Sequence, residues 1–182
     1  MQLEKVLRQI DWLQAEKTPG SLLLVGIGGH GGSGKTTLAN AIGKAVPNTE
    51  VVSTDSFWNG ELFDLERLRT EVIDVLASNK TATIGSFEMA SSMPRPTRTI
   101  RPRNVVIIEG VCALHQMFRN QFELRVWVDT PAGVRLQRGV ARDGEGSRDQ
   151  WENVWMRNES AYVQRDRPIE SAHMIVDGTK PY

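Results

Sequence analysis

Apolar residues along most of the chain form either short continuous runs or stripes with helical spacing. Runs bounded by glycine or polar residues are typical of strands buried on both faces of a sheet. These predicted strands lie at residues 21–27, 50–53, 104–109, 124–128 and 174–176. Helices are predicted, mainly from apolar spacing, at residues 1–16, 35–45, 62–76, 111–122, 132–142 and 150–165. Such alternation favours an α/β fold with a parallel sheet and helices on both faces.

Two other segments need a separate interpretation. Residues 78–103 contain Pro94, Pro96 and Pro102, so we expect a loop-rich excursion that carries one or two short strands. Long loops in compact domains are often functional, which makes this excursion the expected acceptor site. The apolar stripe of the first sixteen residues is expected to pack against the body of the domain.

Composition limits the class of protein. A chain of 182 residues with 40% apolar and 24% charged residues fits one globular domain, residues 1–182. Lysine plus arginine number 22 and aspartate plus glutamate number 22, and this balance argues against nucleic-acid binding. Cys112 is the only cysteine, so a cytoplasmic location is the default. The longest apolar run, residues 22–27, is far too short to cross a membrane.

A glycine-rich phosphate loop lies between the first predicted strand and the next helix. Residues 29–36 satisfy the pattern GxxxxGK[ST] in the context that this motif requires. Glycines let successive backbone amides approach phosphate oxygens, and the following helix N-terminus adds positive charge. Lys35 is expected on the β and γ phosphates of ATP, and Thr36 on Mg²⁺. The predicted nucleotide contacts are Gly29, Gly31, Gly32, Ser33, Gly34, Lys35, Thr36 and Thr37.

Acidic residues follow two of the predicted strands. In an open parallel sheet the ligand crevice lies at the carboxyl ends of the strands. We predict Asp55 as the general base that accepts the proton of an acceptor hydroxyl. Glu109 ends the run Val105–Ile108, and we predict it as the acidic partner of Thr36 at the magnesium ion. Asp129 is expected only to cap the next helix.

Arginines at helical spacing precede a glycine-containing hinge. Arg138 and Arg142 are followed by Gly144 and Gly146, which predicts a small helical lid at about residues 138–150. Closure of such a lid would bring guanidinium groups to the transferring phosphoryl group and exclude water. Arg138 and Arg142 are therefore predicted as catalytic residues together with Asp55 and Lys35.

Taken together, these segments resemble the family of uridine kinases, phosphoribulokinases and bacterial pantothenate kinases. The resemblance rests on GGHGGSGKTT, STDSFW, VVIIEG and VDTPAGVRLQRGVARD, in the family's order and spacing. It implies a three-layer P-loop fold, with a central five-stranded parallel sheet and a small helical lid. It also implies the same roles for Lys35, Thr36, Asp55 and Glu109 as the residues themselves suggest, and places Arg138 and Arg142 in the lid.

The acceptor is less closely defined. Where uridine kinases carry Tyr-Asp-Phe and a nearby histidine, this chain has Phe87, Glu88, Met89 and Ser92. The predicted substrate contacts are Asp55, Phe57, Glu88 and Glu109. The sequence thus predicts an ATP-dependent kinase with Mg²⁺, a small alcohol acceptor and, as first choice, a nucleoside.

Two alternative functions stay open: a kinase of another small alcohol of the pantothenate, sugar or shikimate type, and a non-kinase regulatory nucleotide-binding module. The oligomeric state is also open, with a homodimer as one option. No nucleic-acid or membrane partner is expected.

Overall fold

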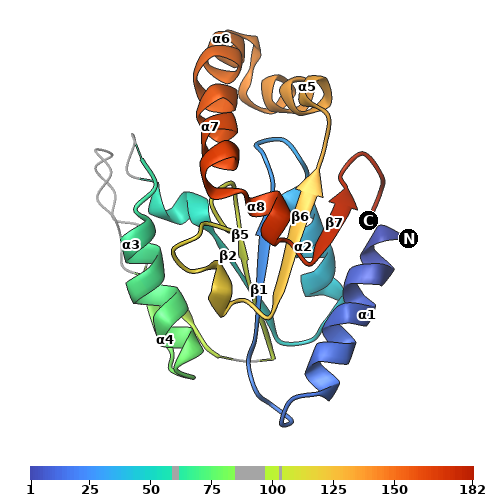
Figure 1. Cartoon of the computed structure of the whole chain (residues 1–182), viewed down its shortest axis with the longest axis vertical. Coiled ribbons are helices and arrows are strands. Elements are labelled where there is room, and N and C mark those ends of the chain that lie inside the picture. The colour runs from blue at the N-terminus through green and yellow to red at the C-terminus, as the bar shows by residue number, and fades with distance from the viewer. Residues whose placement is uncertain (59–61, 85–96, 103) are drawn as a thin grey trace.

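Five parallel strands form the central sheet of the protein (Figure 1). The computed structural model describes residues 1–58, 62–84, 97–102 and 104–182. The strand order is β2-β5-β1-β6-β7, which agrees with the predicted α/β fold. The strands are β1 (Leu23–Gly28), β2 (Thr49–Ser53), β5 (Val105–Glu109), β6 (Leu124–Asp129) and β7 (Met174–Asp177).

Two apolar cores lie on opposite faces of this sheet, because successive strand side chains point to alternate sides. On β1, Leu23 and Val25 belong to one core and Leu24 to the other. Helices α1 (Gln2–Ala15) and α2 (Lys35–Ala45) cover the face of Leu23. Val6 and Ile10 of α1 are buried there, so the N-terminal helix packs on the domain as predicted.

A broken helical stretch covers the second face. It consists of α3 (Leu65–Leu68), the π-helical turn η2 (Arg69–Ile73) and α4 (Asp74–Ala77). The predicted helix 62–76 begins only at Leu65, because the Asp64 carboxylate accepts a hydrogen bond from the Arg67 amide at 3.0 Å and caps it. The excursion at 78–103 contains the antiparallel pair β3 (Ala82–Ile84) and β4 (Arg98–Ile100), which confirms the expected short strands.

The helix predicted at residues 111–122 is wrong. This segment forms successive turns and a short 3₁₀ helix, η3 (Arg119–Gln121). Leu114 and Phe122 pack directly over Gly26 of β1, where an added Cβ would lie 2.7 Å from either side chain. Turns let both Leu114 and Phe122 reach the space above this glycine. The energy gained by this packing outweighs the helix propensity of the segment.

A helical segment stands beyond the carboxyl ends of the strands (Figure 1). It contains α5 (Ala132–Asp143), η4 (Glu145–Ser147), α6 (Arg148–Gln150), the π-helical turn η5 (Trp151–Trp155) and α7 (Met156–Asp166), followed by α8 (Pro168–Ser171). Gly144 separates α5 from the rest at φ +92°. Within the described residues, no helix combines the length and apolar character needed to cross a membrane.

Candidate active site

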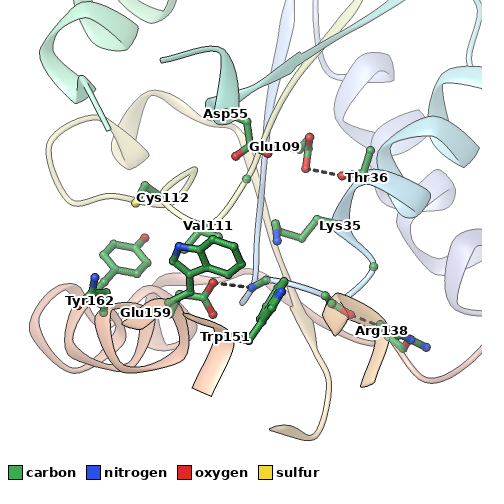
Figure 2. A pocket seen from close by; sticks show the side chains of 18 of the residues that line it. Lys35, Thr36, Asp55, Glu109, Val111, Cys112, Arg138, Trp151, Glu159 and Tyr162 are labelled. Carbon is green, nitrogen blue, oxygen red and sulfur yellow. Dashed lines mark hydrogen bonds between the residues drawn. The ribbon is translucent and has the colours of Figure 1, made fainter. Parts of the chain in front are cut away.

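A cavity of about 1340 Å³ lies where the strands end. Its wall comes from the phosphate loop, the 3₁₀ turn η1 (Thr54–Phe57) after β2, the residues after β5, the segment α5–α7 and the residues after β7. Figure 2 shows Lys35 between Asp55 and Glu109 on one side and Glu159 and Trp151 on the other. Segments far apart in the sequence therefore meet around one lysine.

The phosphate loop has the predicted strand–loop–helix context. It connects β1 to α2, which begins at Lys35. Gly32 adopts φ +72°, and a Cβ there would lie 2.5 Å from the carbonyl oxygen of Arg135, so only glycine fits. The ammonium group of Lys35 donates a hydrogen bond to the His30 carbonyl at 2.8 Å. Burial lowers the pKa of Lys35, whereas Glu109 raises it.

The hydroxyl of Thr36 and the carboxylate of Glu109 meet at the cavity wall. Thr36 Oγ1 donates to Glu109 Oε2 at 3.2 Å. Glu109 is only 3% exposed, and burial raises its pKa, while Lys35 and hydrogen bonds from Ser53 and Thr36 lower it. Two oxygen donors beside a lysine are suited to a hard cation that is shared with phosphate oxygens.

Asp55 lies on the neighbouring strand end. β2 pairs with β5 so that Ser53 is opposite Glu109, and Asp55 follows within η1. The Ser53 hydroxyl accepts a hydrogen bond from the Asp55 amide at 3.3 Å, which caps this turn and leaves the carboxylate exposed to the cavity.

Arg138 and Arg142 both line the cavity from α5. Arg138 Nη1 donates to the carbonyls of Gly32 at 3.3 Å and Gly178 at 3.0 Å. The Arg142 guanidinium pairs with Asp143 at 2.7 Å and lies 5.8 Å from the centre of the Trp151 ring. Both arginines therefore line the cavity from the segment that the sequence predicts to be a lid, residues 138–150.

Three predicted contacts are not at the cavity wall. Phe57 is 1% exposed and belongs to the core, and its ring centre lies 5.4 Å from the Arg67 guanidinium. Its neighbour Trp58 lines the cavity instead. Gly29 lies against the Val128 carbonyl beneath the loop, and Ser33 is completely buried.

Most of the predicted nucleotide contacts do line the cavity: Gly31, Gly32, Gly34, Lys35, Thr36 and Thr37. The chemical roles of all site residues stay predictions. Glu88 lies outside the described residues.

His30, within the phosphate loop, packs edge-on against Trp127 with ring centres 5.4 Å apart. Burial lowers its pKa to about 4, and Arg135 and Lys35 act in the same direction. The imidazole is therefore neutral at physiological pH.

Sequence reasoning missed the part of the wall that α7 provides. Glu159 is buried, and its Oε1 accepts a hydrogen bond from the Gly31 amide at 3.0 Å. It lies on one helix face with Trp155 and Tyr162, which also line the cavity. Trp155, Glu159 and Tyr162 are spaced so that they share one helix face, and a carboxylate between two aromatic residues on such a face could have been noticed in the sequence.

Comparisons with known proteins identify the family of the chain. A family model described as an AAA domain matches residues 25–163. The uridine kinase of Alkaliphilus metalliredigens is 32% identical over 145 residues, covering 68% of this chain and 69% of that protein. Uridine-cytidine kinase C of Dictyostelium discoideum is 28% identical over 142 residues, covering 70% of this chain but only 31% of that longer protein.

Among solved structures, a possible uridine kinase from Bacillus stearothermophilus has a TM-score of 0.65 at 22% identity, covering 95% of this chain and 100% of that chain. At 22% identity the structural match supports the fold alone, and the sequence matches support the family. The chain belongs to the uridine kinase family of P-loop kinases.

Proposed function

We propose that this protein transfers the γ-phosphoryl group of ATP to a hydroxyl group of a small molecule, and that the acceptor is a nucleoside. One observation carries the proposal: Asp55, Lys35 and the Thr36–Glu109 pair face the same cavity. A phosphate cradle and an exposed carboxylate in one cavity are what phosphoryl transfer to an alcohol needs.

The nucleotide would bind with its phosphates on the loop. Amides of the loop and the N-terminus of α2 supply hydrogen-bond donors and positive charge. The Lys35 ammonium group, which donates a hydrogen bond to the His30 carbonyl within the loop, would contact the β and γ phosphates. Because Lys35 is buried, its interaction with an anion is screened little by water.

A magnesium ion fits the donor set of Thr36 and Glu109. The hydroxyl and carboxylate supply two hard oxygen ligands, and phosphate oxygens would supply others. A bound cation would also offset the cost of the buried Glu109 carboxylate, whose pKa burial raises. Magnesium would neutralise charge that develops on the β and γ phosphate oxygens.

Asp55 would act as the general base in the transfer step. The acceptor hydroxyl gives its proton to the Asp55 carboxylate while its oxygen forms a bond to the γ phosphorus. The bond from the γ phosphorus to the bridging oxygen breaks, and ADP leaves. Arg138 and Arg142, with residues 138–150 as a lid, would stabilise the spread charge on the phosphoryl group.

The rest of the cavity suits a flat acceptor. The wall includes several aromatic or apolar side chains, Trp58, Phe63, Cys112, Trp155 and Tyr162, beside polar ones such as Asn158 and Arg165. Aromatic rings favour stacking on a planar group such as a nucleobase. The relatives named uridine kinase support the same class of acceptor.

The test is a coupled assay of ADP release with ATP and Mg²⁺, run across nucleosides, pantothenate, sugars and shikimate. We expect release that depends on a nucleoside and that exceeds the acceptor-free blank. Release that depends on another alcohol would support kinase activity and would show that the acceptor is not a nucleoside. Nucleotide binding with only slow, acceptor-independent hydrolysis would favour the regulatory module instead.

A further inference from the structure

The backbone of the phosphate loop is held by side chains that follow β6. The Ser33 carbonyl accepts a hydrogen bond from Thr130 Oγ1 at 2.9 Å. The Gly32 carbonyl accepts one from Arg138 at 3.3 Å, and the Gly31 amide donates one to Glu159 at 3.0 Å. Three consecutive loop residues are thus hydrogen-bonded to residues 130–159, the segment that contains the lid.

The Glu159 contact differs from the other two because it places an acid on an anion-binding loop. Glu159 is 9% exposed, and Arg135, which faces it, is 7% exposed. Arg135 Nη1 lies 3.6 Å from Glu159 Oε2, and neither atom has a hydrogen-bond partner. Burial raises the pKa of Glu159, whereas the Gly31 amide and nearby cations lower it. Burying such a carboxylate is costly, so packing alone is a poor reason for it.

Beside the cavity, the loop is in close contact with the neighbouring helices at Gly31. An added Cβ on Gly31 would lie 2.7 Å from Glu159 Oε1 and 2.9 Å from the Trp151 ring. Trp151 is itself packed on Gly139 of α5, where an added Cβ would lie 2.3 Å from the indole. Gly31 of the loop, Trp151 of η5 and Gly139 of α5 are therefore in direct van der Waals contact, one against the next.

We propose that Glu159 is a positioning residue that couples the phosphate loop to the lid, by holding the Gly31 amide and the Arg135 guanidinium at the same time. The inference rests on the proposed function, in which the loop binds the phosphates of the nucleotide. Occupation of the loop then orders residues 138–150 and sets Arg138 and Arg142 for transfer. Figure 2 shows Glu159 on the lid side of Lys35, where it can make this connection.

Backbone hydrogen exchange, measured with and without a non-hydrolysable ATP analogue and Mg²⁺, tests the coupling. The proteins are the wild type, Glu159→Ala, Glu159→Gln and the control Glu170→Gln. Glu170 lies in α8, is exposed, and pairs with Arg167 at 3.7 Å, outside residues 138–150. Melting temperatures without nucleotide are measured for all four, so that a loss of stability is seen separately.

In the wild type and the control we expect the analogue to slow exchange in both the loop and residues 138–150. In Glu159→Ala the loop is still protected, but protection of 138–150 falls about tenfold, as is usual for a coupling energy of this kind. Glu159→Gln keeps an acceptor for the Gly31 amide and loses the charge opposite Arg135, so an intermediate loss is expected. If the alanine variant does not fold, the coupling is tested with Glu159→Gln.

Equal protection of 138–150 in the wild type and in both Glu159 variants would overturn the coupling and leave the proposed function intact. Tighter binding of the analogue by Glu159→Ala, with the lid still protected, would also overturn it, because the carboxylate would then only compete with phosphate for the Gly31 amide. Absence of loop protection in the wild type would refute the proposed function, and the inference with it.

Discussion

The hydroxyl of Thr36 donates a hydrogen bond to the carboxylate of Glu109 at 3.2 Å, although 73 residues separate them in the chain. The sheet explains this contact. β1 and β5 are neighbouring parallel strands with Ile27 opposite Glu109, and the loop after β1 returns over the strand ends to begin α2. Their proximity is therefore a consequence of strand order and leads to a first prediction.

Glu109→Gln is expected to raise the Mg²⁺ concentration for half-maximal activity by about tenfold or more, on the scale expected for a lost charge-assisted contact. The amide keeps an oxygen but loses the negative charge that attracts the cation. Because burial disfavours the charged form of Glu109, the unfolding temperature without ligand is expected not to fall. Activity titrated with Mg²⁺ and a thermal melt check both parts. An unchanged Mg²⁺ requirement would argue against a role at the metal.

Asp55→Asn is expected to lower turnover at least about a hundredfold, the usual scale for loss of a general base. Affinity for ATP should change little, because Asp55 lies in η1 and not in the phosphate loop. Steady-state kinetics with the acceptor identified by the screen, together with equilibrium binding of ATP, measures both. Asp11→Asn on the exposed side of α1 is the control. Wild-type turnover in the Asp55 variant would remove the proposed base.

Gly32→Ala is expected to destabilise the protein by at least about 1 kcal/mol, the usual cost of a non-glycine residue in a sparsely populated backbone region. Gly32 has φ +72°, and the added methyl group would meet the Arg135 carbonyl at 2.5 Å. Nucleotide binding should be lost as the loop moves.

Gly133→Ala is the matched control, because nothing lies within 4 Å of the new Cβ. Alanine favours helices over glycine by up to about 1 kcal/mol, so this variant should be as stable as the wild type or more so. Chemical denaturation of both variants gives the comparison. Equal stability of the two would mean that the loop is not confined as described.

His30 is expected to make the protein less stable in mild acid. Its pKa is about 4 in the folded protein, against an ordinary value of 6.5. Between these values the unfolded chain binds more protons, so this contribution to stability decreases as the pH falls from about 6.5 to 4. His30→Asn cannot take up this proton. Urea denaturation at pH 7.5 and 5.5 should show a smaller loss in the variant than in the wild type, and equal losses would contradict the assignment.

Local sequence was enough to predict the phosphate loop and its flanking elements. The strand, the glycines and the helix that begins at Lys35 are consecutive, and their backbone conformations follow from the residues themselves. Asp55 and Glu109 were also within reach, because parallel strands bring their carboxyl ends to one edge. The chemical roles of these residues remain predictions, as do the cytoplasmic location and the state of assembly.

Predictions from local sequence failed where contacts with residues distant in the chain determine the conformation. The turns at 111–122 depend on the room that Gly26 leaves for the side chains of Leu114 and Phe122. Phe57 is buried in a core that the residues next to it in sequence do not reveal. The sequence by itself determined the α/β pattern and the phosphate loop, since both depend on contiguous residues. Only the tertiary structure decided that Glu159 meets Gly31, because that contact across 128 positions depends on where α7 stands beyond the carboxyl ends of the strands (Figure 1).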